Sequence, residues 1–246
     1  MSGDAPEAGL TPDRRDTRPT GEFFLLAHVA LLVAVFVGFT PTFYLRPLYR
    51  AHPLPIVLYV HGAVLTCWFA LTVLQGLLIR TKRYRWHRQI GFAIAGYAAL
   101  VVAMGLIADL RMASEIRTPQ DAENIIVVGN FFSLVYFTTY VSLALVLRKR
   151  PDAHRRLILL ASISIVGPAL ARFTEWPIFP GGMNARPLYG VGGLLALYGA
   201  LIVYDLIVRR RPHPVSWIGA LALLVCSVIA VYLAVSGAGF HILHGA

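Results

Sequence analysis

Charged residues and cysteine are both scarce in this 246-residue chain. Asp and Glu together number 12, charged residues make up 14% of the sequence, and there are two cysteines. Soluble domains carry about 25% charged residues, so the deficit excludes an ordinary soluble fold and requires long segments that avoid water. Cys67 and Cys226 lie inside apolar runs and form no CxxC pair. We therefore expect neither a disulfide framework nor a redox centre.

The motifs of several enzyme classes are also missing. The chain contains no HExxH zinc motif, no GxSxG elbow and no pair of catalytic carboxylates, and no glycine-rich phosphate loop follows a strand. Its apolar runs lack the buried acidic residues that are typical of proton and cation pumps. Hydrolase and ion-pump functions are disfavoured, and we predict a protein that is not an enzyme.

What the chain has in place of charge is hydrophobic sequence, at 57% of its residues. Seven apolar runs are each close to the ~20 residues that a helix needs to cross ~30 Å of hydrocarbon. They lie at about 22–40, 55–79, 88–110, 125–147, 156–174, 187–208 and 215–237. Lipid offers backbone groups no hydrogen-bond partners, so each run must be helical. The prediction is an all-α membrane bundle of about seven transmembrane helices, in which the fifth run is the weakest because it contains Pro168.

The predicted domain organisation is simple. Residues 1–21 are polar and carry almost no large apolar side chains, so we expect a disordered cytoplasmic tail. Residues 22–246 form a single transmembrane domain.

The distribution of Lys and Arg predicts the orientation. The tail and the loops after the second, fourth and sixth runs hold 16 of the 22 basic residues. The opposite side holds Arg46, Arg50, Arg111, Arg117, Arg172 and Arg186. The richer side faces the cytoplasm, so the amino terminus is cytoplasmic and an odd number of spans leaves the carboxyl terminus outside. The net charge of +10 fits loops that face anionic lipid. We expect membrane lipid as a partner and no nucleic acid; membrane-protein partners and a homo-oligomer stay open.

Three of the eight histidines lie where a mechanism could use them. His61 is in the second run, roughly 9 Å into the outer leaflet, whereas His87 and His154 begin the third and fifth runs at the cytoplasmic edge. The resulting gap of about 25 Å excludes a single three-histidine metal centre. His87 and His154 share a level and could ligate a haem iron or a metal ion, and His28 is a further candidate near that level. The alternative is that interfacial His-Arg pairs anchor the helix starts among lipid headgroups.

Other polar residues have local explanations. Asn130, Arg172 and Glu175 lie near the depth of the second-run histidine and are its candidate partners. Arg172 and Glu175 are three residues apart, and Asp205 lies four before Arg209, so each pair can form a local ion pair on one helix surface.

Several short motifs follow one another through the middle of the chain. They are His61-Gly62, Gln75, His87-Arg88 with Gly91, then Arg148, Arg150, His154-Arg155-Arg156 and Arg172. Their order and spacing resemble those of a family of uncharacterised bacterial multi-span membrane proteins, over about residues 55 to 175. The resemblance implies a multi-pass protein of the bacterial inner membrane, and that family has no established activity to carry over.

A more distant similarity is to the transmembrane b-type cytochromes. By position, it implies His61, His87 and His154 as haem ligands, with Arg88 and Arg155 placed to hold haem propionates. That architecture needs two histidine pairs at matched depths, and the fourth run contains no histidine. Only the pair of His87 and His154 can be completed in the core.

Two functions stay open at this point. The favoured one is a non-enzymatic membrane protein, either an assembly factor or a carrier of lipid or small molecules. The alternative is a membrane protein that transfers electrons through haem b bound by His87 and His154.

Overall fold

The computed structural model describes residues 20–119, 121 and 123–244. Nearly all of the predicted tail over 1–21 therefore lies outside the described residues. The described part of the chain is helical and contains no strand, which confirms the predicted all-α fold. The α-helices are α1 (Thr20–Phe39), α2 (Arg46–Tyr49), α3 (Ile56–Arg80), α4 (Tyr84–Glu115), α5 (Glu123–Val146), α6 (Pro151–Ser164), α7 (Gly167–Ala171), α8 (Gly193–Arg209), α9 (Pro214–Val235) and α10 (Ala238–His244). Short π- and 3₁₀-helical turns are η2 (Thr40–Tyr44), η3 (Arg172–Glu175), η4 (Gly182–Ala185) and η5 (Leu188–Gly192).

Six helices of the described chain are long and apolar enough to cross a membrane. They are α1 with η2, α3, α4, α5, η5 with α8, and α9. The pair of α6 and α7 qualifies as a seventh span when its two parts are taken together, with a bend of 44° between them. This agrees with the prediction of about seven spans.

The bend in the seventh span follows from its proline. Helix α6 ends at Ser164, four residues before Pro168. Proline has no N–H to donate to the carbonyl four residues back, and its ring collides with that carbonyl. The helix therefore breaks at the predicted weak point and restarts as α7.

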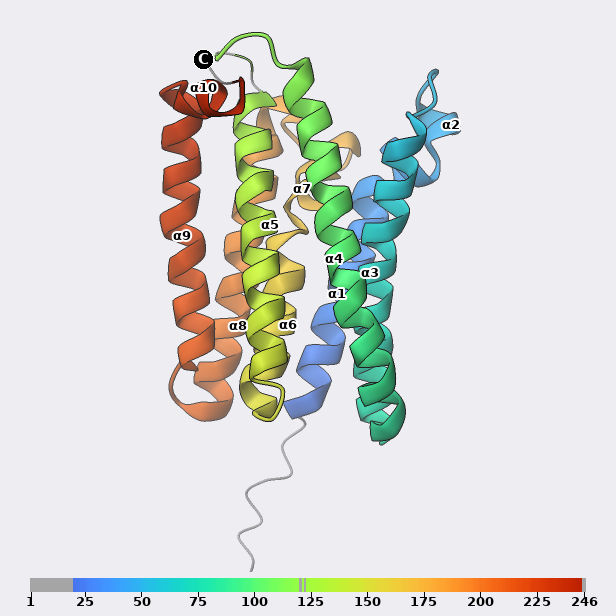
Figure 1. The fold of residues 1–246 in the computed structure, drawn as a ribbon, viewed down its shortest axis with the longest axis vertical. Coiled ribbons are helices and arrows are strands. Elements are labelled where there is room, and N and C mark those ends of the chain that lie inside the picture. Colours follow the sequence, from blue (N-terminus) through green and yellow to red (C-terminus); the bar gives the residue numbers. More distant parts are fainter. Residues whose placement is uncertain (1–19, 120, 122, 245–246) are drawn as a thin grey trace, which may run out of the picture.

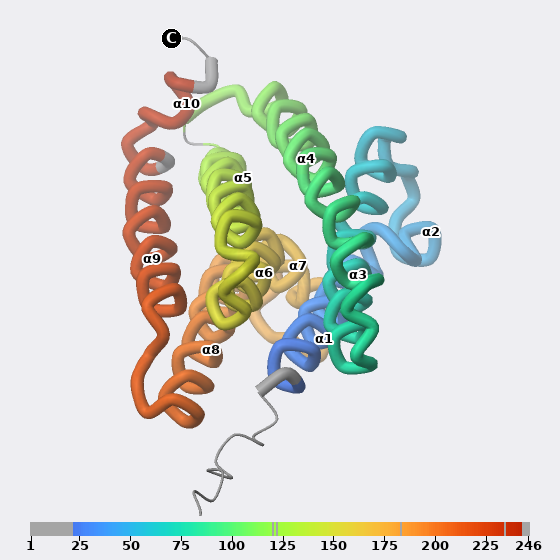
Figure 2. The backbone as a smooth tube through the Cα atoms, turned by 60° about the horizontal axis from the view of Figure 1, so that its bottom comes forward, coloured from blue at the N-terminus to red at the C-terminus, as the bar shows by residue number. Residues whose placement is uncertain are grey.

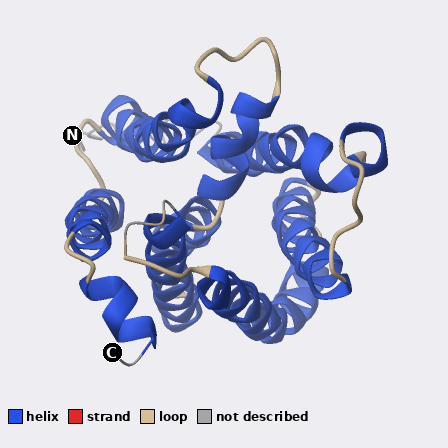
Figure 3. Cartoon of the chain, turned by 90° about the horizontal axis from the view of Figure 1, so that it is seen from above, coloured by secondary structure: helices blue, strands red, loops and turns tan. Residues whose placement is uncertain are grey.

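The ends of the helices separate the charges as the sequence predicts. The α3–α4, α5–α6 and α8–α9 connections, which carry the basic clusters, lie at the same end of the bundle as the start of α1 (Figure 1). Helices α2 and α10 lie at the opposite end. We call these the inner end and the outer end. Viewed from above, the helices stand side by side and several are seen nearly end-on (Figure 3).

Helix α6 forms the centre of the bundle. It packs against α1, α5, α8 and α9 (Figure 2), and every residue from Leu159 to Ser164 is buried. Trp68 of α3 donates to the Ser162 hydroxyl at 3.2 Å and packs edge-to-face on Phe137 of α5. These contacts tie three spans together at mid-depth.

Large apolar side chains face away from this centre on the surrounding helices. Leu26, Phe92 and Ile207 are 63%, 69% and 67% exposed. A helix whose apolar side chains point both inward and outward is suited to a surface covered by lipid.

Candidate functional site

A cavity of about 480 Å³ lies in the outer half of the bundle. Its volume is in the range of small-molecule sites, about 300–1,000 Å³. Its ionisable and amide-bearing lining residues come from α2, α3, α4, α5 and the segments that follow α2 and α7. They are Arg46, Arg50, His61, Asp109, Asn130, Arg172, Glu175 and Arg186.

Much of the cavity wall is apolar. Phe39, Leu65 and Phe69 are among the side chains that line it. The ring of Phe43 lines it as well, and packs so closely on Gly62 that a Cβ atom there would meet the ring at 2.5 Å. Gly62, next to the second-run histidine, is therefore the residue that lets this aromatic wall pack on α3.

Arg172 is a cation held in the cavity wall by contacts with α7 and α1. Its Nη1 donates to the Pro168 carbonyl at 2.8 Å, and its guanidinium carbon lies 4.7 Å from the centre of the Phe39 ring. Within the described ranges, no carboxylate lies within 4.0 Å of this guanidinium. Arg172 thus brings to the cavity a positive charge that has no ion-pair partner among the described residues.

Glu175 pairs with other arginines than the sequence predicted. Its Oε2 accepts from Arg50 at 2.5 Å and its Oε1 accepts from Arg186. The prediction of a local Arg172–Glu175 ion pair is therefore wrong, because the two partners come from chain segments on either side that reach the same carboxylate. The Arg50 side chain is 45% exposed and the Glu175 side chain 13%, so this bridge lies at the outer mouth of the cavity.

His61 lies where its depth predicts, in the outer half. Its Nδ1 donates to the Met104 carbonyl at 3.0 Å, because a carbonyl oxygen only accepts. The candidate partners Asn130, Arg172 and Glu175 line the same cavity. The structure therefore brings this predicted set together around a cavity, although the hydrogen bond of the imidazole goes to α4.

The sequence contains a signal for this cavity in its basic residues on the outer side. Four of the six basic residues on the outer side line it, which are Arg46, Arg50, Arg172 and Arg186. The distribution of Lys and Arg between the two sides predicts the orientation of the chain, but these outer arginines also mark the cavity. Arginines on the side where they are rare point to a binding site.

His87 and His154 come together at the inner end, as their shared level predicts. His87 lies in the first turn of α4 and His154 in the first turn of α6, and the two imidazoles interact electrostatically. His154 Nδ1 donates to the Ala144 carbonyl at 2.9 Å, which leaves its Nε2 for another partner. His87 Nδ1 is buried and makes no hydrogen bond within the described structure.

Further buried polar atoms lie at this inner level. Within the described structure, the amide nitrogen and oxygen of Gln75 and Nδ1 of His28 are buried without a hydrogen-bond partner. The Gln75 amide faces Gly91, where a Cβ atom would lie 3.8 Å from its oxygen. Among the described residues, no group of three or more His, Cys, Asp or Glu side chains is placed to hold a metal ion.

The two arginines expected near haem propionates differ in their surroundings. Arg88 is exposed at the inner end of α4. Arg155 already pairs with Asp152, and its guanidinium lies 4.8 Å from the centre of the Phe24 ring. Arg88 is therefore the freer of the two for an anionic group at this level.

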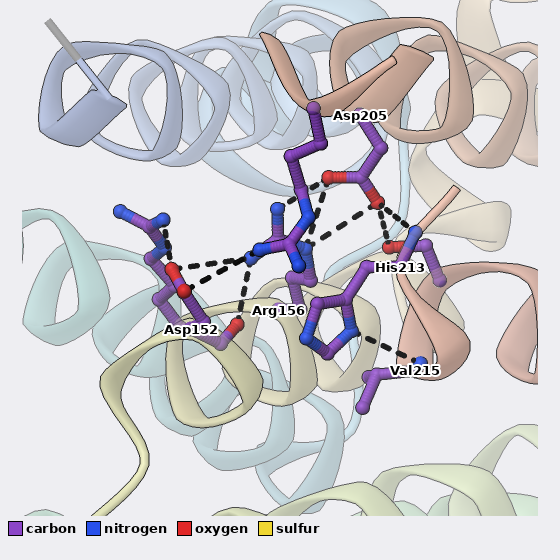
Figure 4. A network of polar contacts seen from close by, with 8 residues as sticks. Asp152, Arg156, Asp205, His213 and Val215 are labelled. Atoms are coloured by element: carbon purple, nitrogen blue, oxygen red, sulfur yellow. Dashed lines mark hydrogen bonds and ion pairs between the residues drawn. The ribbon is translucent and has the colours of Figure 1, made fainter. Parts of the chain in front are cut away.

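A buried ion pair joins three helices at the inner end (Figure 4). Asp205 of α8 accepts from Nε of Arg156 on α6 at 3.1 Å and also from its Nη2. The same carboxylate accepts from the Ser216 hydroxyl of α9 at 2.6 Å and from the His213 backbone N–H at 3.1 Å. The predicted Asp205–Arg209 pair is wrong, because the partner of Asp205 lies on another helix.

The arginine of that predicted pair has another partner. Arg209 donates to Asp152 at 3.4 Å. The sequence alone could not predict the contact of Arg209 with Asp152, because only tertiary packing brings these two residues together.

His213 lies outside the spans, in the α8–α9 connection. Burial lowers the pKa of this histidine, and the nearby Arg156 and Arg209 lower it further. Its Nδ1 accepts a hydrogen bond from the Val215 backbone N–H at 3.1 Å. This bond needs an unprotonated Nδ1, so the fold stabilises the neutral ring.

Two acidic residues are buried within the spans, contrary to the expectation that the spans lack them. Asp205 is 0% exposed and Asp109 is 7% exposed. Asp205 is neutralised by Arg156, whereas the partner of Asp109 is the uncharged amide of Asn130, whose nitrogen donates to Oδ1 at 2.9 Å. Asp109 therefore differs from Asp205 in that its hydrogen-bond partner carries no charge.

The fold and the site together define a multi-pass membrane protein with an arginine-lined, ligand-sized cavity in its outer half. Comparison with protein-family models, with curated proteins and with solved structures finds no match. The chemistry of the cavity is therefore the basis for the function proposed next.

Proposed function

We propose that this protein is a carrier that binds an amphipathic anion in the outer cavity, and that it works in the bacterial inner membrane. The ligand class is an anionic lipid, or a lipid-like small molecule with a phosphate or carboxylate group. The observation that carries the proposal is the guanidinium of Arg172, which faces a cavity with apolar walls and has no carboxylate partner in the described chain.

The charges of the cavity favour an anion over a cation. Four arginines line it against two acidic residues, Glu175 and Asp109. A guanidinium presents paired N–H donors that match the oxygens of a phosphate or carboxylate. In a partly desolvated site such a contact is stronger than at an exposed surface.

The apolar wall selects the rest of the ligand. Phe39 stacks on the Arg172 guanidinium and Phe69 lies further along the lining. An acyl chain or another apolar body laid against these rings leaves water, which contributes about 25 cal/mol per Å². A ligand with an anionic head and an apolar body satisfies both parts of the cavity.

Binding to the purified protein in detergent tests the proposal. We expect dioctanoyl phosphatidylglycerol to bind more tightly than dioctanoyl phosphatidylcholine, whose headgroup carries no net charge. Arg172→Gln should weaken the binding of phosphatidylglycerol about tenfold or more, because a charge-assisted contact is worth about 1.5–3 kcal/mol. Inorganic phosphate, which has no apolar body, should not displace the lipid.

Arg111→Gln is the matched control. Arg111 is exposed on α4, lies 3.9 Å from Glu115 and does not line the cavity. This variant should bind phosphatidylglycerol as the wild type does. Equal affinity in Arg172→Gln and wild type would overturn the proposal.

A second candidate function is electron transfer through haem b, which the position of His87 and His154 in the first turns of α4 and α6, at the same end of the bundle, favours. An axial pair needs two imidazoles, and both rings have a nitrogen without a partner in the described structure. Bound haem would supply one-electron chemistry, His87 and His154 would hold its iron, and Arg88 would stand near its charged edge.

A visible spectrum separates the two candidates. A reduced-minus-oxidised haem band that is lost in both His87→Ala and His154→Ala would support the second. A well-folded protein purified without haem or metal would end it.

A further inference from the structure

Asp109 is an acidic residue on the α4 wall of the cavity, and it is 7% exposed. Asn130 of α5 donates to one of its oxygens at 2.9 Å. In the described part of the chain, no Lys, Arg or His nitrogen lies within 4.0 Å of its carboxyl group, whereas Glu175 contacts two arginines. The two acids of the cavity therefore differ in their charge compensation.

The surroundings of Asp109 disfavour a permanent negative charge. One hydrogen bond from a neutral amide compensates little of the cost of removing a carboxylate from water. The side chain of Asn130 offers one donor group, its amide nitrogen. The nearby Ser133 hydroxyl donates to the Gly129 carbonyl and so does not donate to Asp109. Binding of a proton from the bulk solution would remove this charge.

The other ionisable groups that face this wall are identifiable. On α3, His61 lines the cavity and donates Nδ1 to the Met104 carbonyl. On η3, Arg172 lines it as a cation, and Glu175 lines it as a carboxylate paired with Arg50 and Arg186. Tyr44 of η2 and Arg46 of α2 are the remaining ionisable lining residues. On α5 the facing residues, Asn130 and Ser133, do not ionise. Asp109 is thus the acid of this wall that can change charge without breaking an ion pair.

We propose that Asp109 is the proton-binding residue that couples proton uptake to anion binding in the outer cavity. This inference rests on the proposed carrier function and names its coupling ion. As the anion enters, a proton from hydronium or a buffer acid of the bulk solution adds to a carboxylate oxygen of Asp109 and forms an O–H bond. When the anion leaves, this O–H bond breaks and the proton returns to the bulk solution. The pair of anion and proton enters without adding net charge.

The physical reason is mutual repulsion. An anion held by Arg172 lies in the same cavity as the Asp109 carboxylate, so each negative charge weakens the binding of the other. Protonation of Asp109 therefore tightens anion binding, and by linkage the bound anion tightens proton binding by the same factor.

The test measures the binding of dioctanoyl phosphatidylglycerol to the full chain in detergent between pH 5.5 and pH 8.5. In the wild type, we expect the affinity to fall about tenfold as pH rises. Titration calorimetry in two buffers of different ionisation enthalpy should show proton uptake on binding. Asp109→Asn should bind tightly across the range, with the pH dependence and the proton uptake both lost.

Asp121→Asn is the matched control. Asp121 is in the outer α4–α5 connection, where it accepts from the backbone N–H groups of Arg117 and Thr118, and it does not line the cavity. This variant should keep the wild-type pH dependence. If Asp109→Asn does not fold, Asp109→Glu is the second variant, and it should keep proton uptake with a displaced midpoint.

The outcomes separate the two proposals. Tight binding of phosphatidylglycerol by Asp109→Asn with the wild-type pH dependence would overturn the role of Asp109 and leave the carrier function standing. An unchanged midpoint in Asp109→Glu would overturn it as well. Failure of the wild type to bind phosphatidylglycerol at any pH would overturn both.

Discussion

Arg156 and Asp205 are 1% and 0% exposed at the inner end, and each offsets part of the cost of burying the other's charge. A single substitution leaves one buried charge without its partner. We expect Asp205→Ala to destabilise the protein by about 3–5 kcal/mol in denaturant unfolding followed in detergent.

The matched control for this pair is Asp152→Ala. The Asp152 side chain is 53% exposed although it contacts Arg155, Arg156 and Arg209. Solvent screens such contacts, so we expect a loss of about 1 kcal/mol or less. Comparable losses in the two variants would show that the buried pair has no special role.

His213 makes the inner end sensitive to acid. Its folded-state pKa is lowered from 6.5 by burial and by two arginines, so the folded protein binds fewer protons than the unfolded chain. The contribution of His213 to the free energy of unfolding is therefore fully present above the pKa of the unfolded chain. It is lost as pH falls below about 6.5.

The variant His213→Asn isolates that effect. We expect the melting temperature of the wild type in detergent to fall between pH 7.5 and pH 5, and to fall less in the variant, because Asn gains no proton. The same fall in both proteins would mean that another group controls the response to acid.

The contact of α1 with α7 depends on a glycine. A Cβ atom on Gly38 would collide with the backbone carbonyl of Ala169, and a backbone atom cannot move aside as a flexible side chain can. Gly38→Ala should therefore lower the melting temperature by several degrees, since overpacking costs about 1–3 kcal/mol.

Gly96→Ala is the control on another helix. A Cβ atom on Gly96 of α4 meets nothing within 4 Å, and alanine favours a helix over glycine by about 0.5–1 kcal/mol. This variant should be neutral or stabilising. A loss of stability as large as that of Gly38→Ala would contradict the close packing of α1 on α7.

The helices were predictable from sequence because each is set by local composition. Long apolar runs fixed the spans, and Pro168 fixed the position of the break. The level of each histidine followed from its position along a helix, so His87 and His154 lie at the same end of the bundle, at the starts of α4 and α6. The partners of Glu175 and Asp205 were not predictable, because a local spacing rule considers only residues on the same helix.

At the scale of the whole molecule, the basic clusters gather at one end of the bundle (Figure 1). We expect this end in the cytoplasm. A single cysteine introduced at Ser236, at the outer end after α9, should react in intact cells with a maleimide that cannot cross the membrane. One at Lys149, in the α5–α6 connection, should react only after lysis. The opposite pattern would invert the orientation and place the cavity on the cytoplasmic side.

The central claim is that the outer cavity selects an anionic headgroup through Arg172. Native mass spectrometry of the wild type in an equimolar mixture of phosphatidylglycerol and phosphatidylcholine with matched chains measures that selection directly. We expect phosphatidylglycerol to dominate the bound lipid in the wild type and in Arg111→Gln, and the preference to be lost in Arg172→Gln. Equal occupancy by the two lipids in the wild type would contradict it.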